Sequence, residues 1–526
     1  MTVVSNVFGR YRRWVEKGLE ELCPYGTETL KEKSGKIVFL SVTAAVISMA
    51  FVLLINGPGF FTWLLMGFVT YIMTREIPVL ILRNMRNLLY MKLPGYLSGV
   101  RKKFLNLGNI PEAVREASRE MSEEIRLNAE EIHDILLLGD RRKAVREYVG
   151  KGVRNRFLKL FLIQAFEASE FGDGKGEKEG SVFAENLNIL RNGVAGELYL
   201  SRKTAYMFSG YMTVAVVPVL FFGVFQKTGL SFSENMTGFY EGYGKAVLLA
   251  ALILSFFVYR MVSEAGADAG KTEKIFSGAW PEKFSVKLEN NKGIICRLIR
   301  MLISETDTEG TVAETVIKMA AAFSFPVISG IVLGVERCPG GLMILGAMGV
   351  MSSLMPMLEL VFKKARYKNL MVEEIKRMQM VIMMERKLES ITVTDLLSDL
   401  ELFARAFGNE IRETLNNLPG GAEKALRNLK EKGKKKNGYF ESIADGFLAV
   451  DEVGIEDAFA DTISDRENME KMEELENTIR TEKRKDLTDI IAWMPGAVML
   501  GGYFVIPFLK MTLGEMEELF SILKGI

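Results

Sequence analysis

Residues 265–272 read Ala-Gly-Ala-Asp-Ala-Gly-Lys-Thr and are the first stretch whose spacing suggests chemistry, because they resemble a phosphate-binding loop. Such a loop needs a glycine, four residues, and then Gly-Lys-Ser or Gly-Lys-Thr, and it should follow a β-strand. Here Ala265 fills the first glycine position and an apolar helical run precedes it. The stretch therefore predicts a helix end and a linker, and Lys271 is not expected to bind a nucleotide.

Metal and nucleophile chemistry has little support. The single histidine, His133, lies between acidic neighbours, but the chain offers no second histidine to complete a ligand set. The three cysteines, Cys23, Cys296 and Cys338, are far apart and lack zinc-type spacing. We find no Ser-His-Asp set and no dinucleotide fingerprint. The sequence predicts no enzyme, no cofactor and no metal site, and it places His133 on a solvated helix face.

Charged residues within apolar segments are a further candidate. Arg75 and Glu76 stand near the end of the second apolar run, and Glu359 stands in the sixth. Charge at the centre of a bilayer is costly, so such residues can mark an ion path. The alternative, which we favour, is that they lie at the membrane interface and reach into the headgroups.

A repeated pattern is the strongest architectural signal. Residues 139–148 and 420–429 share the frame Gly-x-x-x-Lys-Ala-x-Arg. About twenty residues downstream of each copy, the chain has Glu-x-Gly, at Glu170 and Gly172 and again at Glu452 and Gly454. A glycine at this place can take a positive φ and close a helix, with the glutamate pairing locally. A role of these residues in docking a partner is the alternative.

Apolar runs long enough to span a bilayer alternate with charged helical regions, and no strand-like alternation of any length is present. We expect about seven transmembrane helices. The expected order is an N-terminal segment 1–36, spans in 37–82, a first charged domain 83–204, spans in 205–262, a linker 263–316, spans in 317–362, a second charged domain 363–488, a span at 489–510 and a tail 511–526.

Lysine and arginine flank these runs unequally and predict the orientation. They are dense in the N-terminal segment and after the second and sixth runs, and sparse in the intervening loops. By the positive-inside rule, the N-terminus and both charged domains face the cytoplasm, and the C-terminal tail faces out. The run at 246–262 is then the extra crossing that makes the repeats parallel, unlike inverted transporter repeats. The predicted fold is an all-α integral membrane protein with two parallel-repeat cytoplasmic helical bundles.

Two basic clusters are candidate partner-binding surfaces. They could meet anionic lipid headgroups or an acidic protein, whereas nucleic acid is disfavoured because no aromatic residues interleave for base stacking. A solvated surface without a partner is the alternative. The candidate residues are Arg141, Arg142, Lys143 and Arg146 in the first cluster, and Lys430, Lys432, Lys434, Lys435 and Lys436 in the second.

With its repeated block, amphipathic helix and Glu-x-Gly closure, the chain resembles the type II secretion F-domain family over about residues 35–510. These are platform proteins of type IV filament and type II secretion machines. The two-domain form is similar to archaeal pilus or archaellum platforms, or to a fusion of two Tad-type subunits. The matching positions are Lys143, Arg146, Glu170 and Gly172, then Lys424, Arg427, Glu452 and Gly454.

The resemblance implies a non-enzymatic protein of the cytoplasmic membrane. It would form a homo-oligomer, dock a hexameric secretion ATPase and pass its motion to pilin-like subunits. The chain departs from compact members of the family in its larger number of spans, its long 263–315 linker and its Gly172–Gly180 insertion. A transporter or channel and a membrane-anchored regulatory scaffold are the competing hypotheses. A neighbouring secretion ATPase gene would discriminate among them.

Overall fold

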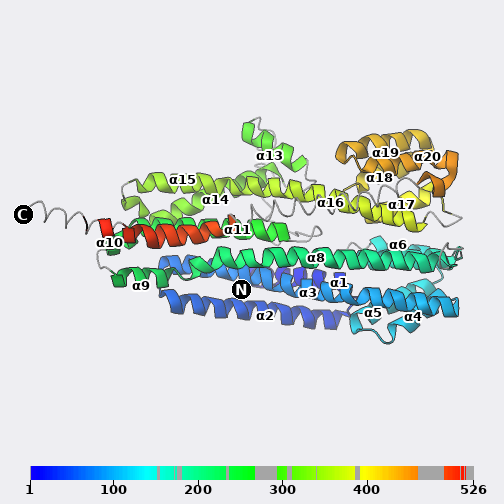
Figure 1. Ribbon diagram of the computed structural model, residues 1–526, viewed down its shortest axis with the longest axis horizontal. Coiled ribbons are helices and arrows are strands. Elements are labelled where there is room, and N and C mark those ends of the chain that lie inside the picture. Colours follow the sequence, from blue (N-terminus) through cyan, green and yellow to red (C-terminus); the bar gives the residue numbers. More distant parts are fainter. Residues whose placement is uncertain are drawn as a thin grey trace, which may run out of the picture. The chain divides into compact units, whose positions relative to one another are not determined.

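The protein is almost entirely helical wherever its structure is described (Figure 1). The computed structural model contains no strand in these residues. The described residues are 2–150, 155–170, 172–174, 180–232, 236–266, 293–304, 311–338, 340–385, 391–404, 406–459, 491–509, 511–513 and 516.

The chain divides into two compact units, and each draws on segments far apart in the sequence. Unit 1 holds most of the charged helical sequence, and unit 2 holds most of the apolar sequence. Unit 1 comprises Met1–Phe39, Ile77–Lys203 and Tyr367–Thr478, and unit 2 comprises Leu40–Glu76, Thr204–Arg366 and Ile479–Ile526.

Within the part of the chain that the structure describes, six helices are long and apolar enough to cross a membrane, or seven if a bent pair counts as one span. Large apolar side chains on them face outward, such as Ile328 and Met343, which is the pattern of lipid-facing surface. The protein is therefore a multi-pass membrane protein, as the sequence predicted. The candidate spans are Thr27–Asn56, Phe60–Leu107, Tyr243–Ser263, Val312–Leu333, Gly341–Val361 and Ile491–Leu513, with Thr213–Leu220 and Phe222–Phe232 as the bent pair.

Several of these helices continue from apolar into charged sequence without a break. Helix α3 (Phe60–Leu107) contains Pro78 and Pro94 and belongs to unit 2 as far as Glu76 and to unit 1 from Ile77. The sequence predicted that a span ends at residue 82 and that a separate domain begins at 83. Helix α3 instead continues through both residues without a break. Helices α8 (Val182–Leu220) and α16 (Met355–Glu385) also have one end in each unit.

The third span is bent by 48° where α8 ends and α9 (Phe222–Phe232) begins. Asn56 is the last residue of α2 (Thr27–Asn56). Its side chain hydrogen-bonds to backbone groups on both sides of this bend. Its side-chain amide donates to the carbonyl of Leu220 at 2.9 Å, and its side-chain oxygen accepts from the amide of Gly223 at 2.7 Å. A Cβ on Gly223 would lie 2.8 Å from the Cα of Asn56, so glycine permits this approach. Unpaired backbone groups are expensive in lipid, which explains the amide at this place.

The remaining elements of unit 2 follow α9 along the chain. They are α10 (Thr237–Glu241), α11 (Tyr243–Gly266), α13 (Ile294–Ser304), α14 (Val312–Leu333), the short helix η2 (Val335–Arg337), α15 (Gly341–Ser353) and the π-helical turn η4 (Val498–Val505). Helices α14 and α15 pack side by side along their lengths (Figure 1). They form the hairpin expected for the 317–362 region.

In unit 1, the first charged region continues from α3 into four shorter helices. At the start of helix α4 (Ile110–Ser118), the Asn109 side chain accepts from the amide of Glu112, and a proline lies in the first turn. The others are α5 (Glu123–Leu137), α6 (Arg141–Gly150) and α7 (Arg156–Glu170). Helix α1 (Thr2–Leu22) buries Val15 and Leu19 in the same unit.

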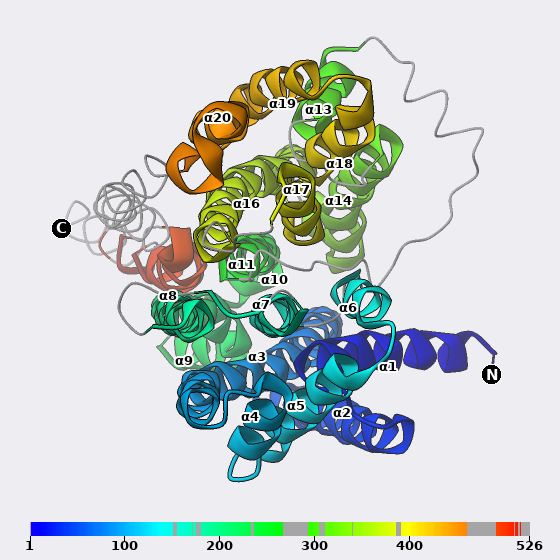
Figure 2. The same ribbon diagram turned by 90° about the vertical axis from the view of Figure 1, so that its right-hand side faces the viewer.

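The second charged region continues from α16 into α17 (Val393–Phe403), α18 (Gly408–Asn417), α19 (Ala422–Lys436) and α20 (Phe440–Ala458), with η3 (Leu418–Gly420) between α18 and α19. Figures 1 and 2 show α18, α19 and α20 gathered beside α17. A capping box joins Thr392 and Asp395 at the start of α17. The buried Glu374 carboxylate of α16 accepts from the amides of Ala406 and Phe407, both at 2.9 Å, which fixes the start of α18.

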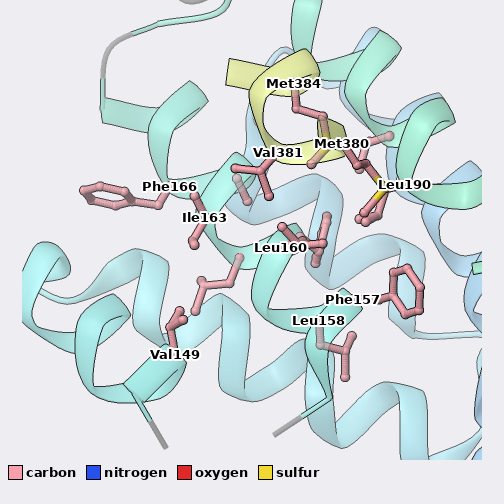
Figure 3. Packing of buried hydrophobic residues seen from close by; sticks show 14 of the residues in the cluster. Val149, Phe157, Leu158, Leu160, Ile163, Phe166, Leu190, Met380, Val381 and Met384 are labelled. Atoms are coloured by element: carbon pink, nitrogen blue, oxygen red, sulfur yellow. The ribbon is translucent and has the colours of Figure 1, made fainter. Parts of the chain in front are cut away.

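One hydrophobic core joins the two charged regions within unit 1. Helix α7 is buried along its length from Phe157 to Ala168. Figure 3 shows its Leu160 and Ile163 beside Val381 and Met384 of α16. The sequence treated 83–204 and 363–488 as two separate bundles, whereas their helices share this core. Superposition of the two regions as parallel repeats stays a prediction.

Candidate functional site

Three carboxyl groups meet in the interior of unit 1. Glu167 comes from α7, Glu385 from the end of α16 and Asp399 from α17, and their nearest oxygens all lie within 4.8 Å of one another. Glu167 and Glu385 are buried. Among the residues that the structure describes, neither carboxylate oxygen of Glu385 has a hydrogen-bond partner. Ionised groups cannot remain so close in the interior without compensation.

The surroundings of this carboxyl cluster favour protonation. Burial, followed by the charge of Asp399, raises the pKa of Glu167 well above its ordinary range. Burial, followed by the charge of Glu167, does the same for the pKa of Glu385. Burial also raises the pKa of Asp399 to about 7, although a hydrogen bond from Glu167 and the charge of Arg146 oppose the rise. Because the three carboxyls interact, the loss of a proton belongs to the cluster as a whole and not to one residue.

Two buried amides hold the cluster in place. The Gln164 amide donates to Glu167 at 3.3 Å. Asn186 of α8 donates to the Gln164 side-chain oxygen at 2.6 Å and to the carbonyl of Met384 at 2.9 Å. This chain of bonds connects α7, α8 and α16, so the position of Glu167 depends on the packing of all three helices.

The cluster can act chemically in two ways. Carboxyls at this separation can share protons, as paired acids do, or they can supply oxygen ligands of the kind that Mg²⁺ and Ca²⁺ prefer. The sequence predicted no metal site and gave no sign of this group as a whole, because Glu167 is more than two hundred residues away from Glu385 and Asp399 along the chain. The available signal was Glu167, an acidic residue within the mostly apolar stretch of α7.

The first basic cluster lies on α6. Arg142, Lys143 and Arg146 are exposed, and Arg141 is half-buried with its guanidinium 3.9 Å from the Glu170 carboxylate. The structure thus brings together Arg141 and Glu170, which the sequence had assigned to different motifs. A single exposed pair of this kind contributes little to stability, so α6 presents most of its positive charge to the outside.

The second basic cluster, on α19, is mostly paired within unit 1. Lys432 contacts Glu413, Lys434 contacts Glu441 and Lys436 contacts Glu410, each at 2.7 Å. Arg427 pairs with Glu423 at 2.7 Å on the same helix. Lys424 and Lys435 are exposed. The sequence read these lysines as one partner-binding run, whereas three of them connect α19 to α18 and α20.

Both glycines of the Glu-x-Gly closures have positive φ, as the sequence predicted. Gly172 has φ 88°, directly after the last residues of α7. Gly454 has φ 84° and ψ 164° and makes a kink inside α20. Glu452 and Glu170 are exposed beside them. The positive φ of both glycines is confirmed, but Gly454 kinks α20, which continues to Ala458, and does not end it. Partner docking by the glutamates stays a prediction.

Polar residues of unit 2 form a network on three spans. Glu76 of α3 accepts from the Tyr259 hydroxyl at 2.7 Å and from the Ser263 hydroxyl at 3.3 Å, both on α11. The Tyr71 hydroxyl accepts from Arg75 at 3.1 Å and from Arg260 at 3.3 Å.

The network continues to α16 through Arg260. Its guanidinium lies 2.8 Å from the Glu359 carboxylate, and Lys363 lies 2.8 Å from the other oxygen of that carboxylate. Arg75, Glu76 and Glu359, which the sequence singled out separately, thus belong to one network. Sequence reasoning missed Arg260, the connecting residue, although its charge inside the fourth apolar run was a usable signal. Mutual pairing of these charges lowers their cost in a membrane and fixes the three helices against one another.

Two other candidates remain to be placed. The sequence predicted His133 on a solvated helix face, but its side chain on α5 is only 14% exposed, and its ring nitrogen lies 3.4 Å from the neighbouring Asp134 carboxylate. Lys271 and the rest of the phosphate-loop-like stretch after Gly266 lie outside the described residues.

No known protein family, curated protein or solved structure matches this chain.

Proposed function

We propose that this protein is the membrane platform of a filament-assembly or secretion machine of the type IV pilus kind. It would sit in the cytoplasmic membrane as a homo-oligomer, dock a hexameric ATPase and pass motion to pilin-like subunits in the bilayer. The proposal starts from the repeated Lys-Ala-x-Arg and Glu-x-Gly pattern and from the multi-pass helical architecture. It assigns the chain a mechanical role, with the energy supplied by the partner.

The observation that supports the proposal best is the continuity of the long helices. Helices α3, α8 and α16 each run from a membrane-spanning segment into the charged helical unit. Within unit 1 they share one hydrophobic core with α7 and α17. Interiors packed in this way transmit displacement because they are dense and resist compression. A push on unit 1 would therefore reach several membrane helices together.

The competing transporter hypothesis predicts polar residues along a substrate path. The polar network in unit 2 is the feature closest to such a path. Its charged groups Arg260, Glu359 and Lys363 contact one another, which suits a structural connection between helices. We therefore retain the platform as the proposal.

Among the candidate docking surfaces, the exposed face of α6 is the better one. Reversing the lysines of α19 would break their contacts to α18 and α20 and would confound binding with folding. Arg142 and Lys143 are exposed, so their side chains lie outside the hydrophobic core of unit 1. An acidic surface on the ATPase would be attracted to this face, mainly through a faster association.

The test is retention of a hexameric secretion ATPase from the same organism by the full-length protein in detergent, across salt concentrations. The double variant Arg142→Glu with Lys143→Glu should retain less ATPase at low salt, where screening is weakest. The matched control is Lys102→Glu with Lys103→Glu, an exposed basic pair at the end of α3. Failure of the wild-type chain to retain the ATPase at any salt would refute the platform proposal, whereas equal binding by both variants would refute only the α6 surface.

A further inference from the structure

Helix α13 (Ile294–Ser304) has three faces of different chemistry. One face is buried through Cys296, Ile299 and Leu302. These side chains pack in a small cluster with Val312 of α14 and Leu360 of α16. The helix is therefore attached to unit 2 along its whole length.

The residues that pack against the buried face of α13 indicate the depth of this helix in the membrane. Val312 is the first residue of one candidate span, and Leu360 lies one residue before the end of another, at Val361. The chain leaves the second of these spans into the basic sequence Lys363-Lys364-Ala365-Arg366. Basic residues after a span mark the membrane interface on the cytoplasmic side. Helix α13 thus lies at the level where both spans leave the hydrocarbon.

The other two faces point away from the unit. Ile294 and Met301, at 85% and 52% exposed, lie seven residues apart and so share one side of the helix. Arg297 and Arg300 are exposed on the flank beside them, three residues apart. Isoleucine and methionine exposed to water are costly, whereas the same residues in the acyl-chain boundary are favourable.

We propose that α13 is an interfacial helix that binds an anionic phospholipid surface. Its apolar flank, with Ile294 and Met301, inserts below the headgroups. Its basic flank, with Arg297 and Arg300, contacts the lipid phosphates, which guanidinium groups bind well. The occupant is lipid because the helix lies at the end of two spans, where a bilayer already surrounds the protein, and because the charge of its outer face is positive.

Nitroxide labelling of the full-length protein in lipid nanodiscs tests this proposal. Single cysteines replace Met301, the exposed basic residue Arg297 and, as a buried reference, Ile299. The wild-type chain labelled in parallel measures the background from Cys23, Cys296 and Cys338. Collision rates with oxygen, which concentrates in lipid, and with a water-soluble nickel complex then report the surroundings of each label. The nanodiscs contain phosphatidylcholine alone or with phosphatidylglycerol.

The Met301 label should collide several-fold more often with oxygen than with the nickel complex, and the Arg297 label should show the reverse. Adding Arg297→Gln and Arg300→Gln should move the Met301 label toward water in phosphatidylglycerol nanodiscs more than in phosphatidylcholine ones. Equal access of the nickel complex to Met301 and to an exposed label at Glu423 of α19 would overturn the proposal. A Met301 label that neither reagent reaches would also overturn it, since another part of the protein would then cover the face.

Discussion

Because of the carboxyl cluster, the free energy of unfolding should fall as the pH rises. Carboxylates held in salt bridges have the opposite effect, since they lose stability as the pH falls. Asp399 has its pKa raised from 3.8 to about 7, chiefly by burial. The folded chain therefore holds a proton that the unfolded chain has released between these values. Because the folded state binds more protons in this window, the free energy of unfolding falls as the pH rises from about 4 to about 7. At low pH, the protonated cluster stabilises the folded chain.

The size of the effect follows from the same values. An upper limit for one proton is about 1.4 kcal/mol per pH unit. Between pH 5 and pH 8, a group with these two pKa values would lose about 3 kcal/mol of stability. Asp399 is half-buried and shares its proton with Glu167, so we expect a change of about 1–3 kcal/mol.

The perturbation is Asp399→Asn, which keeps a polar side chain of nearly the same shape and cannot ionise. Its melting temperature, followed by circular dichroism of the detergent-solubilised full-length protein, should exceed that of the wild type by several degrees at pH 8. The advantage should shrink toward pH 5. Glu385→Gln should act in the same direction, because both carboxylate oxygens of Glu385 lack a hydrogen-bond partner among the described residues. Asp451→Asn, on the exposed face of α20, is the matched control and should change nothing.

If the melting temperatures of the wild type and of both cluster variants change equally with pH, burial of protonated carboxyls is refuted as the cause. A divalent cation held by the cluster would give the opposite sign, since the carboxyls would then be ionised in the folded chain. Melting in EDTA and in added Mg²⁺ or Ca²⁺ at pH 8 separates these outcomes. A rise of the wild-type melting temperature with added cation, absent in Glu385→Gln, would identify a metal site in place of a proton-sharing one.

Three further predictions concern single residues. Asn56→Ala should lower the melting temperature of the solubilised protein, because it removes both side-chain hydrogen bonds at the bend of the third span; an unchanged melting curve would contradict this role. Gly454→Ala should cost about 1–3 kcal/mol in chemical unfolding because its φ of 84° and ψ of 164° strain any other residue, whereas Gly438→Ala should cost less. A membrane-impermeant thiol reagent should reach Cys338 in intact cells and leave Cys23 unlabelled, and labelling of Cys23 would overturn the predicted orientation.

The sequence by itself determined the helices and the candidate spans. Apolar runs and their flanking charges are local signals, and each helix satisfies its own backbone hydrogen bonds, so its existence needs no distant partner. The turn glycines Gly172 and Gly454 were predictable for the same reason, because a positive φ is a property of one residue. The start of α4 is also set locally, by the Asn109 cap and Pro111 in the first turn.

Only the tertiary structure decided which of these helices share a core. Nothing local in α7 indicates that its apolar face meets Val381 and Met384 of α16, some two hundred residues away. Hydrophobic attraction is non-directional, so a buried face predicts burial and leaves the partner open. The same holds for charges: the sequence showed the lysines of α19, but their pairing with Glu410, Glu413 and Glu441 depends on how α18 and α20 pack against it. Glu167, Glu385 and Asp399 form a site only because three helices converge, which brings Glu167 of α7 to two carboxyls more than two hundred residues further along the chain.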